Sequence, residues 1–216
     1  MLKKYPDLPN FHTVEHPLIK HKLFHLRDKD TPKKKFKELT KEISLLLAYE
    51  ATVDLPLVAD TVETPLETLE TVRLDGKKSV ILPILRAGLG MVDGFLELMP
   101  GARVGHIGLF RDEETLKPQK YYFKIPGDHD LRQFLVLDPM LATGGSATAA
   151  IGMLKDEGIT NIRFICLVAA PEGVKRLITD HPDVGIYAAS LDRELNDVGY
   201  ILPGLGDAGD RLFGTR

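Results

Sequence analysis

The chain has 216 residues, of which 44% are hydrophobic and 27% are charged, and its formal net charge at pH 7 is −3. These values lie close to the average for folded globular proteins, so they exclude a disordered, a collagen-like and a disulfide-stapled chain. The near-neutral charge also disfavours a general binder of nucleic-acid backbones, which usually carries an excess of basic residues.

The sequence contains no window of roughly 18 consecutive apolar residues, and the basic residues near its start precede no apolar stretch. We therefore expect a cytoplasmic protein without a membrane anchor. The single cysteine, Cys166, cannot form an internal disulfide. It lies in the apolar run 164–168, where a thiol behaves as a small hydrophobic group, so we expect a structural role for it.

Residues 1–55 are predicted to form an N-terminal helical arm. Its main helix should begin at Thr31 and Pro32, which suit the N-cap and the first helical position, and run to about Ala51. The apolar residues at helical spacing within it are Phe36, Leu39, Ile43, Leu46 and Leu47. The lysines at its start are Lys33, Lys34, Lys35 and Lys37. A basic run can contact nucleic acid, but on the first turn of an amphipathic helix it usually faces solvent.

Beyond the arm, short β-branched runs alternate with helical segments, which is typical of a parallel sheet in an α/β domain. The predicted strands are 79–82, 103–109, 133–137 and 163–168, with a fifth around 184–187. Their continuous apolar character predicts that helices cover both faces of the sheet. Residues 146–157, between the third and fourth predicted strands, have apolar residues at helical spacing, and Gly158 follows as a helix stop. These three elements form one βαβ unit. No repeat or linker divides the chain, so we expect one domain over residues 1–216.

The loop 138–146 follows the third predicted strand, and ligands of such sheets bind beyond the carboxyl ends of the strands. Its adjacent glycines would let backbone N–H groups face a phosphate, with hydroxyls from Thr143 and Ser146 and the start of a helix beside them. The alternative is a glycine turn in which Ser146 merely caps the helix. Asp138 favours the phosphate reading, because a carboxylate at the end of a strand suits ribose hydroxyls.

Two further loops place arginines after strands of the same sheet. Arg86 lies among apolar residues and glycines, where a buried and unpaired cation would be costly, so it should meet a ligand anion or an internal carboxylate. Arg111 begins a run of charged residues that interrupts the strand pattern. We predict a flexible, exposed hairpin over residues 110–123, which would be either a lid or an inert loop.

Residues 199–211 form a glycine-rich segment. Gly204, Gly206 and Gly209 match the spacing of the dinucleotide fingerprint. That fingerprint needs a helix, a strand and an acidic residue about 20 positions on, whereas seven residues follow Gly209. Because positions 199–209 hold no lysine or arginine, a pocket lined by them would suit a neutral planar ligand and disfavour an anionic one.

The sequence gives little indication of a metal site or of a catalytic nucleophile. His12 and His16, like His21 and His25, have i,i+4 spacing, but no further residue completes a ligand set, so we expect satisfied or exposed histidines. No Gly-x-Ser-x-Gly elbow is found, and no cysteine–histidine pair can be argued.

Four segments together resemble one enzyme family. They read Asp-Pro-Met-Leu-Ala-Thr-Gly-Gly-Ser at 138–146, Pro-Ile-Leu-Arg-Ala-Gly at 83–88, Arg-Asp-Glu-Glu-Thr at 111–115, and Gly-Tyr-Ile-Leu-Pro-Gly-Leu-Gly-Asp-Ala-Gly-Asp-Arg at 199–211. In combination they resemble the uracil phosphoribosyltransferases, a branch of the type I phosphoribosyltransferases, and the similarity runs from His16 to the C-terminus. Type I enzymes generally carry two adjacent acidic residues before the Thr-Gly pair; Pro139 replaces the second here, as is typical of the uracil branch.

The resemblance implies an α/β fold with a mostly parallel sheet flanked by helices and a C-terminal base-binding hood at 199–211. It implies transfer of the 5-phosphoribosyl group from 5-phospho-α-D-ribose 1-diphosphate (PRPP) to uracil, which gives UMP and diphosphate in pyrimidine salvage. Mg²⁺ would enter mainly bound to the diphosphate, near Asp207 and without a direct protein ligand. No general base for uracil is evident.

The resemblance also implies roles for individual residues. Arg86, Arg111 and Asp207 would be catalytic, the arginines by stabilising the charge that leaves with the diphosphate. The residues implied to bind PRPP are Arg86, Arg111, Asp138, Pro139, Met140, Leu141, Ala142, Thr143, Gly144, Gly145, Ser146 and Asp207. Those implied to bind uracil are Tyr200, Ile201, Gly206, Asp207 and Ala208. A homodimer or homotetramer and activation by GTP are implied as well, although the sequence locates no GTP site.

Two alternatives stay open at this point. One is a phosphoribosyltransferase for another base, among which orotate fits least, because segment 199–209 lacks a cation for its carboxylate. The other is a pyrimidine-responsive RNA-binding regulator on the same fold, with the lysines at 33–37 as the RNA contact. The net charge of −3 argues against the regulator.

Overall fold

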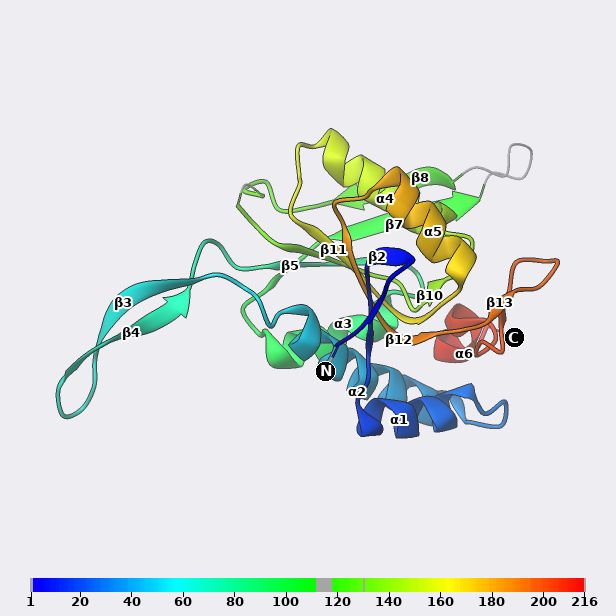
Figure 1. Ribbon diagram of the computed structural model, residues 1–216, viewed down its shortest axis with the longest axis horizontal. Helices are drawn as coiled ribbons and strands as arrows, with labels where there is room; N and C mark the ends of the chain where they lie inside the picture. The colour runs from blue at the N-terminus through cyan, green and yellow to red at the C-terminus, as the bar shows by residue number, and fades with distance from the viewer. Residues whose placement is uncertain (1, 112–117, 130, 216) are drawn as a thin grey trace.

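The computed structural model describes residues 2–111, 118–129 and 131–215, and it contains a central sheet with helices on both faces (Figure 1). The strands lie in the order β1-β2-β12-β11-β9-β5-β7-β8. Their bounds are Leu2–Tyr5 (β1), Leu8–Val14 (β2), Val80–Leu85 (β5), His106–Arg111 (β7), Pro118–Lys124 (β8), Phe134–Leu137 (β9), Ile162–Ala169 (β11) and Gly185–Leu191 (β12). The pairs from β2 through β7 are parallel, while β1–β2 and β7–β8 are antiparallel. The predicted mostly parallel α/β sheet is confirmed.

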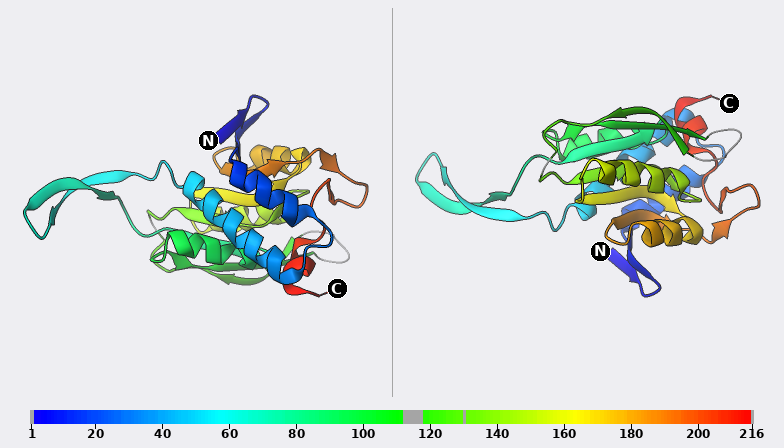
Figure 2. Two further views of the ribbon diagram at one scale, coloured as in Figure 1. Left: turned by 90° about the horizontal axis from the view of Figure 1, so that it is seen from below. Right: turned by 90° about the horizontal axis from the view of Figure 1, so that it is seen from above.

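Helices cover the two faces unequally (Figure 2). On one face lie α1 (Pro17–Arg27), α2 (Lys33–Ala51) and α3 (Leu89–Leu98), and on the other lie α4 (Gly145–Asp156) and α5 (Pro171–Asp180). A short helix, α6 (Ala208–Phe213), precedes the C-terminus. Successive residues of a strand point to opposite faces, and the buried strand residues accordingly divide between two cores. In β9, for example, Leu135 packs under the first group of helices and Phe134 under the second.

The N-terminal region differs from the predicted helical arm. Its first strands form a hairpin, and β2 pairs in parallel with β12, so the region is part of the sheet. The helix expected from Thr31 does form as α2, but its N-cap is Pro32, and the Thr31 hydroxyl donates to the carbonyl of His25 instead. Phe36, Leu39, Ile43 and Leu47 are buried as the helical spacing predicts.

Three other segments refine the predicted elements. The run 103–109 divides into β6 (Arg103–Val104) and β7. The expected hairpin at 110–123 is framed by antiparallel β7 and β8, and its residues 112–117 lie outside the described part of the chain. Cys166 is buried and unpaired as a thiol, which confirms its structural place; burial raises its pKa well above the ordinary value.

A two-stranded projection was not predicted. Strands β3 (Leu57–Glu63) and β4 (Thr68–Leu74) pair over their whole length and extend away from the body (Figure 1). Nearly every residue in them is exposed. The large exposed apolar side chains on this projection are Leu57, Val62, Leu66, Leu69, Val72 and Leu74. Such a surface is typical of a contact with another molecule.

Candidate active site

Two adjoining cavities lie where the parallel strands β5 and β9 end. The first, of about 200 Å³, is lined by Asp138, by residues 140–147, and by Val198 and Gly199, whereas Pro139 is buried and does not line it. The second, of about 240 Å³, is lined by Ala87, by residues 199–201 and by residues 206–209. Asp138, Met140, Ala142 and Gly199 border both cavities. The structure therefore brings the predicted phosphate loop and the predicted base segment together at the carboxyl edge of the sheet, where such folds bind ligands.

The phosphate loop ends in a helix start without a side-chain cap. Gly144 is the N-cap of α4, with φ +78°, and no side chain accepts a hydrogen bond there. The alternative in which Ser146 caps the helix is therefore wrong. Ser146 is exposed and lines the first cavity. The unpaired N–H groups of the first turn of α4 and the helix dipole make this a suitable place for a phosphate.

Neighbouring elements fix the path of this loop. Strand β10 (Met140–Leu141) pairs with β11. Gly173, in the first turn of α5, packs so closely that an added Cβ would lie 2.3 Å from the carbonyl oxygen of Ala142. Residue 144 must also be glycine, because its φ lies in the left-handed region. The path of the loop is thus fixed by contacts within the chain.

Asp138 stands between the two cavities at the end of β9. Burial raises the pKa of its carboxyl group to about 7, and only a long hydrogen bond from the backbone N–H of Met140, at 3.5 Å, acts in the opposite direction. A partly buried carboxylate that lacks donors is well suited to accept hydrogen bonds from ligand hydroxyls.

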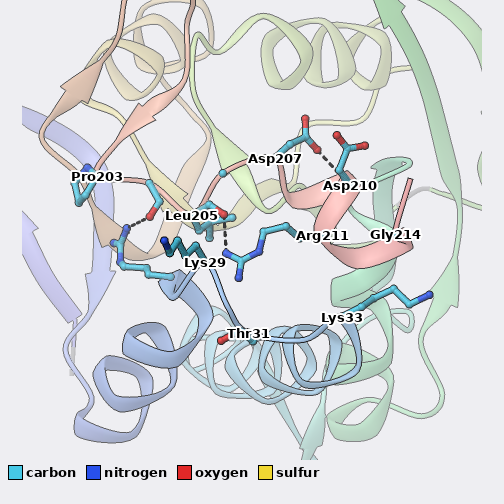
Figure 3. Close-up of a pocket in the computed structure, with 12 residues that line it drawn as sticks. Lys29, Thr31, Lys33, Pro203, Leu205, Asp207, Asp210, Arg211 and Gly214 are labelled. Atoms are coloured by element: carbon cyan, nitrogen blue, oxygen red, sulfur yellow. Dashed lines mark hydrogen bonds between the residues drawn. The ribbon is translucent and has the colours of Figure 1, made fainter. Parts of the chain in front are cut away.

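The C-terminal segment forms the other wall. Strand β14 (Ile201–Leu202) pairs with β13 (Glu194–Leu195), and the side chain of Asn196 accepts from the N–H groups of Val198 and Tyr200. The residues implied to bind uracil, Tyr200, Ile201, Gly206, Asp207 and Ala208, all line the second cavity. Asp207 is exposed and also serves as the N-cap of α6, because its Oδ1 accepts from the N–H of Asp210 at 2.9 Å (Figure 3).

The two predicted arginines are placed differently. Arg86 follows the buried strand β5 but is exposed, which corrects the expectation of burial, and its guanidinium lies 5.9 Å from the ring centre of Phe213. Among the described residues no carboxylate forms an ion pair with it, so the internal salt bridge is absent there. Its neighbour Ala87 lines the second cavity. The backbone of Arg111 ends β7, and its side chain lies outside the described part of the chain.

A third cavity, of about 490 Å³, lies behind the base segment (Figure 3). One wall comes from the connection between α1 and α2, with Lys29, Thr31 and Lys33, and the other from residues 203–207 and α6. Arg211 joins the walls, since its Nη1 donates to the carbonyls of Leu26 and Leu205 at 2.8 and 2.9 Å. Sequence patterns did not indicate this contact, because nothing local to either segment reports the other.

Three of the four histidines named above have structural contacts. His12 departs from the expectation of a satisfied or exposed side chain, because its Nδ1 is buried and has no hydrogen-bond partner in the described part of the chain. His16 caps α1, because its Nδ1 accepts from the N–H of Leu18 at 3.1 Å. His21 and His25 meet edge to face, with ring centres 4.8 Å apart. Within the described ranges, no three acidic, histidine or cysteine side chains gather as a metal site would need. In the same ranges no helix is long and apolar enough to cross a bilayer.

A mostly parallel sheet whose strand β9 leads into a glycine-rich loop at a helix start, beside a C-terminal segment without lysine or arginine at 199–209, is the arrangement expected of a type I phosphoribosyltransferase. The family model of the uracil phosphoribosyltransferases matches residues 13–215. The chain is 60% identical over 206 residues to the uracil phosphoribosyltransferase of Streptococcus salivarius, covering 95% of this chain and 99% of that one. The chain belongs to the uracil phosphoribosyltransferase family.

Further relatives agree. The uracil phosphoribosyltransferase of Geobacillus kaustophilus is 58% identical over 205 residues, which cover 95% of this chain and 98% of the relative. A solved structure, the AQ2163 protein from Aquifex aeolicus, superposes with a TM-score of 0.89 at 39% identity, over 95% of this chain and 98% of that one. These similarities favour neither a phosphoribosyltransferase for another base nor an RNA-binding regulator.

Proposed function

We propose that the two adjoining cavities bind the two substrates of uracil phosphoribosyl transfer. The chain transfers the 5-phosphoribosyl group of PRPP to uracil, forming UMP and diphosphate, a reaction of pyrimidine salvage. The observation that supports this assignment most is the shared border of the cavities at Asp138, Met140, Ala142 and Gly199. It would place the ribose between the phosphate loop and the base segment, as transfer to a base requires.

On the phosphate side, the loop from Asp138 to Ser146 would hold the ribose 5-phosphate. The free N–H groups at the start of α4 and the exposed hydroxyl of Ser146 are suitable donors. Asp138, when ionised, would accept hydrogen bonds from the ribose hydroxyls. This arrangement would bind the sugar phosphate in one orientation, with its reactive carbon directed toward the second cavity.

On the base side, uracil would bind against Tyr200 and form hydrogen bonds with the backbone of Ile201, Gly206 and Ala208. The segment supplies one carboxylate, Asp207, and no basic side chain between 199 and 209. Such a wall suits a neutral pyrimidine and would repel the carboxylate of orotate.

Catalysis would consist of positioning together with charge stabilisation. Positive charge develops at the ribose as the diphosphate leaves. Arg86 and Arg111 would stabilise the departing diphosphate, and the hairpin that Arg111 begins would exclude water from the activated ribose. Mg²⁺ would arrive with PRPP and neutralise part of the diphosphate charge. The exposed carboxylate of Asp207 would lie near this ion without being its direct ligand, and its negative charge would favour the bound cation.

The test is a base-specificity assay with PRPP and Mg²⁺ in which uracil, cytosine, orotate, hypoxanthine and xanthine compete. We expect product from uracil far above the other bases. Preferential use of a purine or of orotate would contradict the proposal. Filter binding of RNA over a range of salt concentrations checks the regulator alternative, and salt-dependent binding of RNA would support it.

Three finer points remain proposals. Assembly into a homodimer or homotetramer is supported by the exposed apolar side chains of the β3–β4 projection, and sedimentation measures it. Activation by GTP follows from the family resemblance alone, and adding GTP to the assay at subsaturating PRPP tests it. The cytoplasmic location stays a prediction from the sequence.

A further inference from the structure

An ion pair between a buried aspartate, Asp192, and a partly buried arginine, Arg27, lies directly behind the base segment. Asp192, which follows β12, is 6% exposed, and Arg27 is the last residue of α1. The guanidinium of Arg27 donates to both carboxylate oxygens, from Nη1 to Oδ2 at 2.7 Å and from Nη2 to Oδ1 at 2.6 Å. A two-bonded fork of this kind fixes both orientation and distance, which a lysine could not do.

The same ion pair also forms hydrogen bonds with the backbone of the base segment at Gly204. Asp192 Oδ2 accepts from the N–H of Gly204 at 2.9 Å, and Arg27 Nη1 donates to the carbonyl of Gly204 at 2.6 Å. Gly204 has φ +61°, and an added Cβ would lie 2.1 Å from the carbonyl oxygen of Ile201. Both backbone groups of one tightly folded residue are therefore held by one ion pair.

The carboxylate at the centre of this network is well satisfied. Burial, the largest single influence, would raise the pKa of Asp192. The hydrogen bonds and the charge of Arg27, together with the hydrogen bonds from Ser190 and Gly204, outweigh it in sum, so the pKa lies below its ordinary value. The Ser190 hydroxyl donates to Oδ1 at 2.8 Å and accepts from Arg27 Nη2 at 3.1 Å. A buried charge with all its partners in place can specify a single local conformation.

We propose that Arg27 and Asp192 are positioning residues for the pyrimidine base. By holding Gly204, they fix the backbone groups of Ile201 and Gly206 on either side of it. This inference rests on the proposed binding of uracil by segment 199–211. Because the phosphate loop is held by β11 and α5 instead, loss of the pair should weaken binding of the base far more than binding of PRPP, which meets this segment mainly at Asp207.

The test uses Asp192→Asn and Arg27→Lys in the full chain. The matched control is Asp54→Asn, which removes the carboxylate of a second arginine–aspartate pair. Arg163 donates to Asp54 at 2.6 Å and to the carbonyl of Ala51. This pair lies near the start of β11, at the edge of the sheet away from the site. Steady-state assays give KM for uracil and for PRPP separately, and isothermal titration calorimetry gives the Kd of UMP. Melting temperatures report on the fold.

We expect Asp192→Asn to raise both KM for uracil and Kd for UMP by about tenfold or more, while KM for PRPP changes by less than about twofold. Arg27→Lys keeps the charge but loses the fork, so it should show a smaller change of the same kind. Asp54→Asn should leave all three constants unchanged.

The outcomes separate the inference from the proposed function. If the unmodified chain does not use uracil, the proposed function fails. If it does, and both variants lower only the melting temperature, the pair is merely structural and the inference is overturned. An equal rise in both KM values overturns it as well, because the effect would then not belong to the base side. Should Asp192→Asn not fold, Arg27→Lys decides by the same comparison.

Discussion

On the phosphate side of the site, the loop is held by elements close to it in the chain, since β10 pairs with β11 and Gly173 packs on the carbonyl of Ala142. On the base side, the contacts come from far away. Arg27 bonds to Gly204, 177 positions on, and Arg211 bonds to Leu26, 185 positions back. The phosphate side is therefore held by local contacts, whereas the base side depends on the packing of the N-terminal helices against the C-terminus.

Substitutions in the two regions should therefore affect binding of different substrates. A defect in the local loop should affect PRPP and little else, and a defect in the long-range contacts should affect the base. Residues on the diphosphate side belong to neither group and should act on the transition state.

The largest effect is expected for Arg111→Ala, which lies outside both regions. In the proposed function Arg111 stabilises the leaving diphosphate, so its removal should raise the transition-state free energy that kcat/KM measures by about 2 to 4 kcal/mol. Steady-state kinetics with both substrates measures this, and Lys124→Ala, at the other end of the same hairpin, is the control. An unchanged kcat/KM would make the hairpin an inert loop.

Gly173→Ala disturbs the local contact that holds the phosphate loop. Its Cβ would press on backbone rather than on a flexible side chain, so the loop must shift, at a cost of about 1 to 3 kcal/mol in stability. Displacement of the loop should raise KM for PRPP far more than KM for uracil. Gly152→Ala in α4 is the matched control, since its Cβ would meet nothing within 4 Å, and it should stabilise the chain by about 0.5 to 1 kcal/mol. Equal changes in both KM values would break the distinction between the two regions.

Asp207→Asn tests a carboxylate that belongs to the base segment but, in the proposed function, acts on the Mg²⁺–diphosphate while it also caps α6. Asparagine caps helices well, so α6 should stay intact and the melting temperature should not change. The lost charge near the Mg²⁺–diphosphate should lower kcat roughly tenfold. Asp207→Ala loses the cap too and should cost about 1 kcal/mol in unfolding free energy. A normal kcat in the asparagine variant would limit Asp207 to its structural role.

The same contrast explains what the sequence could predict. The parallel sheet and the phosphate loop could be predicted because contiguous residues indicate them: apolar runs, adjacent glycines and a helix start. The network of Arg27, Asp192 and Gly204 joins distant segments, and no spacing within one sequence reveals it. The β3–β4 projection was missed because its side chains face solvent on both sides and leave no alternation to detect. Arg86 was expected to be buried from its apolar neighbours, but its own side chain is exposed although Gly88 and Met91, which follow it, are buried.

The smallest effect concerns pH and the carboxyl group between the two regions. Burial raises the pKa of Asp138 to about 7, so the protonated form, a poorer acceptor for ribose hydroxyls, gains as pH falls. Between pH 8 and 6.5, kcat/KM for PRPP should fall about fourfold, in proportion to the ionised fraction. Asp138→Asn should be slower throughout and should lack this step, which separates it from titration of PRPP itself.

The stability of the ligand-free chain tests the same pKa, and it should change with pH in the opposite direction to kcat/KM. Because the folded state holds the Asp138 proton up to about pH 7 and the unfolded state releases it near pH 4, the folded chain binds more protons between these values. Its unfolding free energy should therefore decline as pH rises through that window. Since the carboxyl is partly exposed, we expect a decline of about 2 kcal/mol, absent in Asp138→Asn and measurable by urea unfolding. A pH-independent difference between the two proteins would place the pKa at its ordinary value and assign any loss of activity at low pH to another group.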